Sequence, residues 1–408
     1  MEAYLLEWAG VLLRWLHVVA AIAWIGSSFY FVFLDNNLLK PTDPVLVERG
    51  VDGAMWAVHG GGFYHPQKYL VAPPRIDSKL HWFYWESYTT WLSGFALLVV
   101  TYLWHAEVYL VDPARHNWSP TVAALVAVGL LGAFWLVYDL TCRLAGVGPR
   151  ADRWIAAVML GVIAVACWLV TTLYPGRAAF LLMGAMLATA MSANVLFWII
   201  PGQRKVVAAL TSGQPVDRAA LAIHGQRGKQ RSVHNTYFTL PVLFAMLSNH
   251  WPLLTVAEHN AFVLFTLMLS GALIRQYFVQ RHGYRLGREP NPLPWALAGS
   301  ALIVVVMVAL APRGGGGESP GAAAVDAADR DAVAAIGALV QRHCLACHAG
   351  PGAMKGVRLD EPEALLRHAA AIHQQVVVTR QMPLHNATGM TDEERGQVAA
   401  WYRGLSPQ

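Results

Sequence analysis

The sequence predicts an all-α protein in three parts. Residues 1–311 predict a polytopic membrane bundle of about eight helices, 312–325 a Gly/Pro/Ala-rich linker, and 326–408 a small soluble helical domain. Of the 408 residues, 56% are hydrophobic and 13% are Asp, Glu, Lys or Arg, about half the charge of an average soluble chain. The mean hydropathy is +0.39. This composition excludes an ordinary soluble enzyme and a disordered chain.

Eight apolar runs are each close to the roughly 20 residues that a helix needs to cross a bilayer. The sixth is the shortest and contains Pro241, which predicts a kink. The apolar pattern ends at Ala311, and the following ten residues have the composition of a flexible linker. We expect spans at residues 11–34, 82–104, 121–140, 154–174, 178–200, 233–249, 257–279 and 293–311.

The basic residues alternate between loops and so predict an orientation. Cytoplasmic loops carry an excess of Lys and Arg. Loops 2–3 and 4–5 contain only Arg115 and Arg177, and loop 6–7 contains neither residue type. Both termini are therefore expected outside the cytoplasm, and the net charge of +5 needs no nucleic-acid partner. The loops predicted to be cytoplasmic carry Lys40, Arg49, Lys68, Arg75, Lys79, Arg143, Arg150, Arg153, Arg204, Lys205, Arg218, Arg227, Lys229, Arg231, Arg281, Arg285 and Arg288.

The soluble tail contains the motif Cys344-Leu-Ala-Cys347-His348. This spacing is the attachment signature of a covalent c-type haem. The two thiols suit thioether bonds to the haem vinyl groups, and His348 suits an axial bond to iron. We expect Met382 as the sixth iron ligand. Met354 and Met390 are the competing candidates, and a zinc or redox CxxC pair is the alternative to a haem.

The flanks of this motif predict two helices. Residues 326–343 form the first, and Thr391-Asp-Glu-Glu394 opens the second with a capping box. Residues 326–408 resemble a small class I cytochrome c. Such cytochromes are matured on the outer side of the bacterial inner membrane, so the resemblance implies a periplasmic haem domain, in agreement with the charge pattern.

Polar residues inside the apolar runs are functional candidates because they are costly in a bilayer. Toward the cytoplasmic side these are Glu86, Arg275 and the His234-Asn235-Thr236 segment. Glu86 and Arg275 are alternatively an interhelical ion pair, and the His-Asn-Thr segment alternatively satisfies helix-terminal amides. His17 lies within the first run, where the sequence allows either a b-type haem ligand or an interhelical hydrogen bond.

Two further segments carry predictions. The glycine run in His59-Gly-Gly-Gly-Phe-Tyr64 lacks the spacing of a nucleotide-binding loop, and we expect it to allow close backbone approach to a neighbouring helix or ligand. The basic stretch 214–232 is expected to lie along the cytoplasmic membrane surface.

Several segments together resemble the bacterial membrane-bound urate oxidases. They are His59-Gly-Gly-Gly-Phe-Tyr64, Leu80-His-Trp-Phe-Tyr-Trp-Glu-Ser-Tyr88 with Trp91-Leu-Ser-Gly94, and Ser232-Val-His-Asn-Thr-Tyr237 with Leu247-Ser-Asn-His-Trp-Pro252. The resemblance implies an eight-span domain followed by a cytochrome c. It also implies oxidation of urate to 5-hydroxyisourate, with electrons passed to the cytochrome and then to a respiratory-chain acceptor, an oxidase or a soluble cytochrome c.

A mechanistic hypothesis follows for the membrane residues. Arg275 and Asn235 hold the urate anion. Thr236 or His234 positions water, and His234 or Glu86 takes protons. Because a c-type haem accepts one electron at a time, a second centre or a radical is required, which favours a b-type haem on His17. The alternatives are a quinol–cytochrome c oxidoreductase and a non-catalytic membrane-anchored electron carrier.

Overall fold

The computed structural model describes residues 1–69, 73, 76, 79–112, 115–212, 214–255, 257–311, 327–350, 353, 357–378, 380, 382–383, 386 and 388–405. The described chain is mostly helical, as the sequence predicts, with a small β region between residues 53 and 68. It divides into two compact units, 1–311 and 312–408. Each unit is described by itself.

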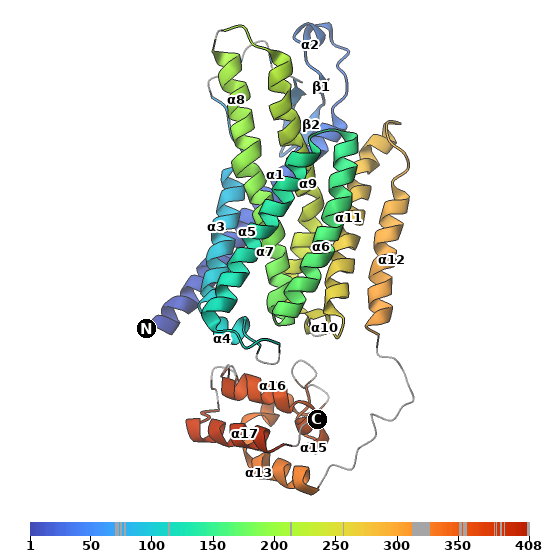
Figure 1. Cartoon of the computed structure of the whole chain (residues 1–408). Helices are drawn as coiled ribbons and strands as arrows, with labels where there is room; N and C mark the ends of the chain where they lie inside the picture. The colour runs from blue at the N-terminus through green and yellow to red at the C-terminus, as the bar shows by residue number, and fades with distance from the viewer. Residues whose placement is uncertain are drawn as a thin grey trace. The chain divides into compact units, whose positions relative to one another are not determined.

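Unit 1 is a bundle of long helices (Figure 1). Each of the eight apolar runs overlaps one of these helices, and two helices continue as π-helical turns, at Val99–Leu103 and Val195–Ile199. The long helices are α1 (Glu2–Asn37), α3 (Trp85–Leu98), α5 (Pro120–Ala145), α6 (Pro149–Leu173), α7 (Gly176–Asn194), α9 (Arg218–Leu247), α11 (Asn260–Arg285) and α12 (Leu293–Ala309).

Five helices of the described chain are long and apolar enough to cross a membrane. They are Tyr4–Asn37, Pro120–Ala145, Pro149–Leu173, Gly176–Thr211 and Asn260–Arg285. The other three expected spans are helical but fall outside this group. The helix α12 has 17 residues, α3 has 14 before its π-helical turn, and the first half of α9 is strongly basic.

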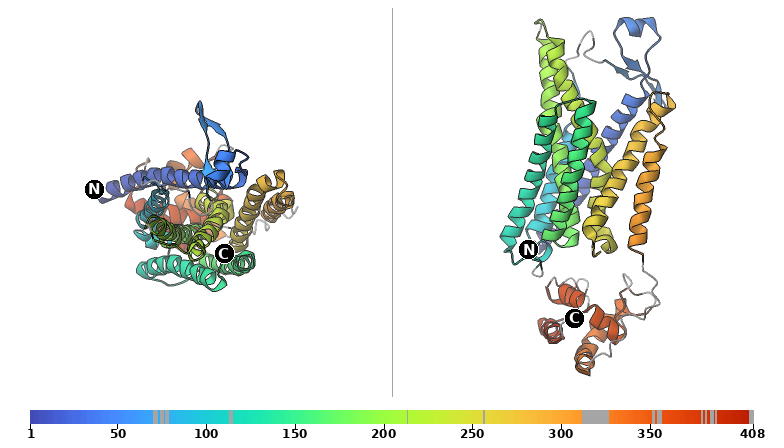
Figure 2. Two further views of the ribbon diagram at one scale, coloured as in Figure 1. Left: turned by 90° about the horizontal axis from the view of Figure 1, so that it is seen from above. Right: turned by 45° about the vertical axis from the view of Figure 1, so that its right-hand side comes forward.

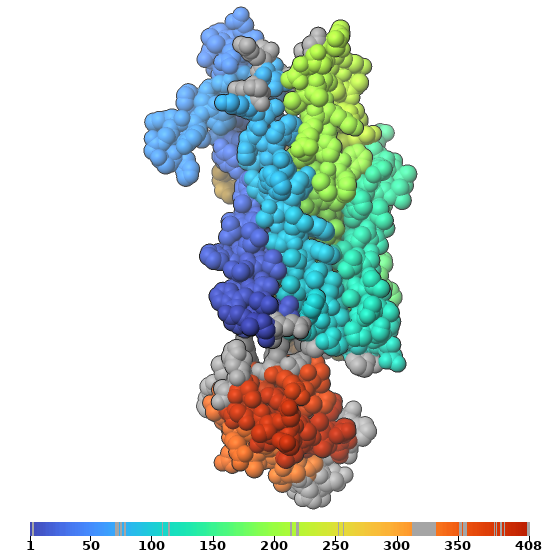
Figure 3. Space-filling view, turned by 90° about the vertical axis from the view of Figure 1, so that its left-hand side faces the viewer, coloured from blue at the N-terminus to red at the C-terminus, as the bar shows by residue number. Residues whose placement is uncertain are grey.

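The segment between α1 and α3 forms a small projection from unit 1 (Figures 2 and 3). In it, β1 (Gly53–Ala54) pairs with β4 (Gln67–Lys68), and β2 (Ala57–His59) pairs with β3 (Gly62–Tyr64), both antiparallel. Gly60 and Gly61 have positive φ, +56° and +80°, and a Cβ on either would meet no atom within 4 Å. The expected close approach to a neighbouring helix is therefore wrong for these two glycines, which instead form the turn of the β2–β3 hairpin.

The helices α8 (Ile200–Thr211) and α9 pack as a pair that extends beyond the rest of the bundle (Figure 1). Since α9 is one continuous helix from Arg218 to Leu247, its basic first half shares an axis with the expected span. The prediction that residues 214–232 lie along the membrane surface stays a prediction. Pro241 lies inside α9 without ending it.

Unit 2 consists of short helices around its own apolar core. These are α13 (Ala327–His343), α14 (Leu345–His348), α15 (Pro362–Arg367), α16 (Ala369–His373), the π-helical Gln374–Val378 and α17 (Asp392–Gly404). Ile336 of α13 and Trp401 of α17 belong to one buried cluster. The predicted capping box is confirmed, because Thr391 accepts the N–H of Glu394 and the Glu394 side chain accepts the N–H of Thr391.

Close packing of α11 against α12 depends on a glycine. A Cβ on Gly299 would lie 2.8 Å from Ile274 Cγ1 and 2.9 Å from the backbone oxygen of Ser270. The Ser270 hydroxyl also donates a hydrogen bond of 2.8 Å to the Gly299 carbonyl. Small residues that let two helix backbones approach closely are typical of helix–helix contacts in membrane proteins.

Replacing Gly299 by Ala should destabilise the protein by about 1–3 kcal/mol, because the added methyl group meets backbone that cannot move independently. The measurement is the midpoint of thermal unfolding in detergent. Gly161→Ala in α6 is the matched control, since a Cβ there meets no atom within 4 Å and both changes bring the same helix propensity. Equal midpoints for the two variants would contradict this account of the interface.

Candidate functional site

In unit 2 the CxxCH motif coincides with α14. Cys344 is the N-cap residue of this helix, and His348 is its last residue. Neither cysteine forms a disulfide within the described chain. The His348 ring nitrogen Nδ1 lies 3.0 Å from the carbonyl oxygen of Val357. Since a carbonyl only accepts, Nδ1 donates, and the lone pair remains on Nε2. A metal-bound histidine is commonly held in this way, so these residues fit a c-type haem.

The backbone of Met382 is held on both sides. Its N–H donates to the Gln375 carbonyl at 3.0 Å, and its own carbonyl accepts from Arg395 of α17 at 2.8 Å. Met382 is half-buried, whereas Met390 is 5% exposed within the apolar core. Met382 therefore suits an axial ligand better than Met390, and Met354 lies outside the described residues.

A zinc site built from the same thiols lacks further ligands. Among the described residues, no group of three or more His, Cys, Asp and Glu side chains is placed to hold a metal ion. Structural zinc needs four such ligands. A haem does not need them, because the porphyrin supplies four nitrogens.

Asp360 links Gly350 to Arg358. Its carboxylate accepts from Arg358 at 2.9 and 3.1 Å and from the Gly350 N–H at 3.1 Å. The Arg358 hydrogen bonds, with that of Gly350, lower the pKa of Asp360 to about 2. The ion pair thus holds Arg358, the residue next to Val357, whose carbonyl accepts from His348.

Asp360→Asn should lower the thermal stability of unit 2 at neutral pH but not at pH 2. The pKa of Asp360 is lower in the folded chain than the ordinary value of about 4, so its stabilisation is present above about pH 4 and is lost as the pH falls toward 2. The measurement is thermal unfolding of the full chain followed by calorimetry. Glu361→Gln, which removes another Arg358 partner but not the Gly350 contact, is the control. A pH-independent difference between Asp360→Asn and the wild type would refute the linkage.

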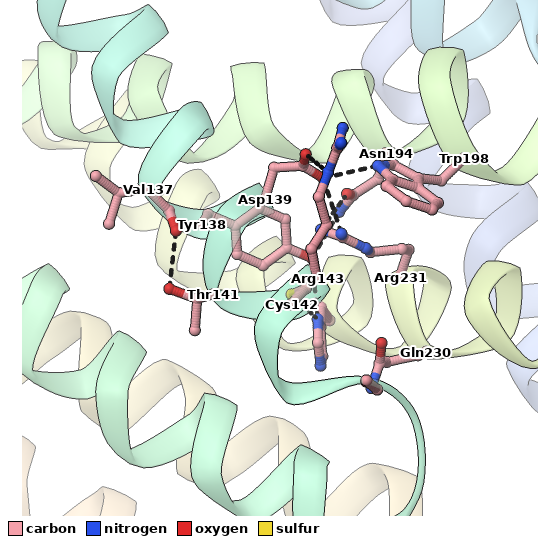
Figure 4. Close-up of polar contacts among 12 residues, drawn as sticks. Val137, Tyr138, Asp139, Thr141, Cys142, Arg143, Asn194, Trp198, Gln230 and Arg231 are labelled. Carbon is pink, nitrogen blue, oxygen red and sulfur yellow. Dashed lines mark hydrogen bonds and ion pairs between the residues drawn. The ribbon is translucent and has the colours of Figure 1, made fainter.

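In unit 1 a buried ion pair joins α9 to α5 (Figure 4). Arg231 is 2% exposed and Asp139 is 4% exposed. The Nη2 of Arg231 donates to Oδ1 of Asp139 at 2.8 Å, and the Trp198 indole donates to the same oxygen at 2.7 Å. Arg143 donates to Oδ2 at 2.6 Å. The charges are therefore compensated and both carboxylate oxygens are used.

The same cluster continues as neutral hydrogen bonds. Asn194 of α7 donates to the Tyr138 hydroxyl and to Oδ1 of Asn235, each at 2.9 Å. Asn235 in turn donates to the Met191 carbonyl at 3.0 Å. The Tyr138 hydroxyl lies 2.9 Å from Nδ1 of His234. A hydroxyl oxygen can accept a second hydrogen bond, so Tyr138 can accept from Nδ1–H and leave the Nε2 lone pair of His234 free to take a proton.

Arg275 lies outside this cluster. It is 6% exposed, its guanidinium lies 3.9 Å from the centre of the Phe29 ring, and its Nε has no hydrogen-bond partner in the described chain. Glu86 is half-buried on α3, and no ion pair between Glu86 and Arg275 occurs in the described residues. Thr236 uses its hydroxyl within α9, on the Ser232 carbonyl.

Asn235 and Tyr237 face different neighbours of α9. The hydroxyl of Tyr237 donates to Gln276 of α11, the residue next to Arg275, whereas Asn235 contacts α7. Side chains two residues apart on an α-helix point about 160° away from each other. Asn235 therefore does not face α11, the helix that carries Arg275. His234 and Tyr237 are three residues apart and are neighbours on the helix surface.

His17 connects α1 to α3. Its Nδ1 lies 3.0 Å from the Thr90 carbonyl and 3.2 Å from the Ser93 hydroxyl. A Cβ on Gly94 would lie 2.7 Å from the imidazole, so the ring occupies the space that the glycine leaves. The structure thus contains the interhelical hydrogen bond, and the Nδ1–H donation leaves Nε2 with the lone pair that an axial haem ligand uses.

Sequence reasoning missed Tyr138, Asn194 and Trp198 as site residues, and it placed Arg231 in a cytoplasmic loop. Asn194 is fully buried, and its signal was a single amide inside an Ala-rich apolar run. The signal for Arg231 was its position four residues before Asn235, which places the two side chains on adjacent parts of one helix face.

Comparison with known families bears on unit 1 as a whole. The family model described as "Urate oxidase N-terminal" matches residues 3–311. The chain belongs to this family. No curated protein and no solved structure matches the chain. The urate oxidase match includes every membrane residue described above and ends where unit 1 ends, so it indicates a urate-related oxidative role for that unit and leaves unit 2 uncovered.

Asp139→Ala should destabilise this family member by about 3–5 kcal/mol, because it leaves the Arg231 charge buried without a partner. Arg143→Ala is the control: it removes a 59% exposed side chain from the same carboxylate and should cost about 1 kcal/mol or less. The measurement is denaturant unfolding in detergent. The double variant Asp139→Leu/Arg231→Met should recover much of the loss, and a double variant less stable than Asp139→Ala would contradict the ion-pair explanation.

Proposed function

We propose that the protein is a membrane-bound urate oxidase that converts urate to 5-hydroxyisourate, with its own c-type haem as electron acceptor. The observation that carries the substrate class is the urate oxidase match over residues 3–311. Five apolar helices support a membrane location. The CxxCH motif and the orientation of His348 support the haem.

The proposed location is the bacterial inner membrane, with both termini and residues 326–408 in the periplasm. The supporting observation is the alternation of basic loops. In unit 1, the short helices α4 (Ala106–Tyr109) and α10 (Pro252–Thr255) lie at one end, and α2 (Pro44–Glu48) and α8 at the other (Figure 1). The end with α4 and α10 is the proposed periplasmic end.

The reaction balances with water as the oxygen source. Urate and one water give 5-hydroxyisourate, two protons and two electrons. A c-type haem, when bound, takes these electrons singly and passes them to a respiratory oxidase or a soluble cytochrome c. The protein must therefore bind an anion, hold a water beside it and remove two protons.

Arg275 is the proposed urate-binding residue. A buried guanidinium whose Nε has no hydrogen-bond partner in the described chain suits an anionic ligand. His234 lies thirteen residues before the end of α9, and Arg275 lies fifteen residues after the start of α11. Both are therefore about 20 Å from the proposed periplasmic end. Tyr237 lies between them, one turn from His234 and bonded to the neighbour of Arg275.

His234 is the proposed proton acceptor, and Asn235 is a positioning residue. Asn194 links Asn235 to Tyr138, whose hydroxyl orients the His234 ring. Glu86 is proposed to carry a proton away from the urate site. Thr236 is proposed to stabilise α9 beside the water that reacts with urate. His17 is the proposed ligand of a b-type haem. This additional redox centre would allow urate to lose two electrons while the c-type haem accepts them one at a time.

Urate should reduce the c-type haem of the purified full chain under anaerobic conditions, measured as the reduced-minus-oxidised spectrum. Arg275→Gln should lower kcat/KM for urate about 100-fold, the effect of losing a charged hydrogen bond to a bound anion. Arg285→Gln is the control, because Arg285 is exposed at the end of the same helix.

The other outcomes identify the alternative functions. Haem reduction by a quinol but not by urate would identify a quinol–cytochrome c oxidoreductase. Reduction by neither would identify an electron carrier. Unchanged urate turnover in single replacements of His234, Asn235 and Arg275, with the haem assembled, would refute the site. The same spectrum shows a second, b-type band if His17 ligates a haem.

A further inference from the structure

Three arginine side chains surround the Trp198 ring near the end of α5. Their guanidinium carbons lie 4.9 Å (Arg231), 5.1 Å (Arg143) and 5.8 Å (Arg227) from the ring centre. Arg231 is buried, whereas Arg143 and Arg227 are exposed. The two exposed guanidinium groups come from different helices, α5 and α9, and are held near each other by the ring that they share. Two accessible positive charges therefore lie on one part of the surface of unit 1.

A single carboxylate opposes these three charges. Asp139 accepts from Arg231 through Oδ1 and from Arg143 through Oδ2 (Figure 4), and it is 4% exposed. Both of its oxygens are therefore already occupied. Arg227 makes no ion pair with a carboxylate among the residues that the structure describes. The cluster as a whole thus has an excess of positive charge, and the arginine without an ion pair is one of its exposed members.

The chain on either side of the cluster adds positive rather than negative charge. Segments 141–155 and 195–232 contain nine Lys or Arg and two acidic residues, Asp152 and Asp217. Asp152 accepts a hydrogen bond from Gln230 at 2.7 Å. Asp217 accepts from the N–H of Ala220 at the start of α9, about 15 Å along the helix from Arg227. The net field at the cluster therefore favours an anionic ligand.

An apolar surface begins next to the cluster, on the side of the expected membrane interior. Leu140 and Leu136 precede Arg143 by three and seven residues, so the three side chains lie on one face of α5. The two leucines are 56% and 57% exposed. Phe197 is 52% exposed and stacks on Trp135 of α5, with 5.1 Å between ring centres. This face thus presents charge at the end of α5 and apolar side chains further along the expected span.

We infer that this surface binds one anionic phospholipid, with its phosphate between Arg143 and Arg227 and its acyl chains on the apolar face of α5. A phospholipid matches both parts of the surface, because guanidinium groups donate hydrogen bonds to phosphate oxygens and acyl chains cover exposed apolar side chains. A free phosphate would use only the charged part. The site lies at the end of unit 1 opposite the proposed periplasmic end. The inference rests on the proposed membrane location and is independent of the substrate.

The test is native mass spectrometry of the delipidated full chain in detergent, which resolves individual bound lipids. Phosphatidylglycerol should bind about tenfold more tightly than phosphatidylcholine with the same acyl chains, because only phosphatidylglycerol has a net negative charge. Arg227→Gln should lower the affinity for phosphatidylglycerol about tenfold, as expected for the loss of one charged hydrogen bond, and should not change the affinity for phosphatidylcholine. Arg285→Gln is the control, because it makes the same charge change at an exposed residue at the end of α11.

Further measurements separate the outcomes. Arg143→Gln should weaken phosphatidylglycerol binding as Arg227→Gln does, and Arg227→Lys, which keeps the charge, should retain most of the affinity. Inorganic phosphate in large excess should not displace the lipid. Equal affinity for the two lipids, unchanged phosphatidylglycerol binding in Arg227→Gln, an equal loss in Arg285→Gln, or displacement by phosphate would each overturn the inference. Failure of the proposed function is seen separately, as a haem that urate does not reduce.

Discussion

The fold of unit 1 depends on the buried ion pair between Arg231 and Asp139. It joins α9 to α5, and Trp198 adds the helical segment after α7 to the same carboxylate. In a low-dielectric interior each of these charges alone is costly, so the three segments are stable only in the register that brings them together. The guanidinium also lies over the Tyr138 ring at 5.0 Å and the Trp198 ring at 4.9 Å. This geometry fixes the rotation of α9 about its axis.

The rotation of α9 decides which of its polar residues face which neighbours. With Arg231 directed at Asp139, Asn235 faces α7, and its amide oxygen and amide nitrogen each make one hydrogen bond there. His234 meets Tyr138, and Tyr237 points toward α11 and the neighbour of Arg275. The rotation of α9 thus places its hydrogen-bonded cluster on one side and Tyr237 on the side of α11.

Unit 2 has an equivalent constraint on a smaller scale. The His348 ring is oriented by the Val357 carbonyl, and Arg395 holds the backbone of Met382 through its carbonyl. Both contacts act through backbone atoms. The positions of these two residues are therefore set locally, by backbone hydrogen bonds within unit 2.

The sequence by itself determined the helical class, the change of character at residue 311, the CxxCH motif and the capping box at Thr391, because each depends on residues close together in the chain. It also marked His234 and Arg275, since polar groups in apolar runs are rare. Only the tertiary structure decided that Arg231 is buried, that Asn194 connects Tyr138 to Asn235, and that Asn235 faces α7. The physical reason is that these facts depend on the rotation of each helix about its axis. That rotation is set by partners on other helices, up to 92 residues away in the case of Arg231 and Asp139.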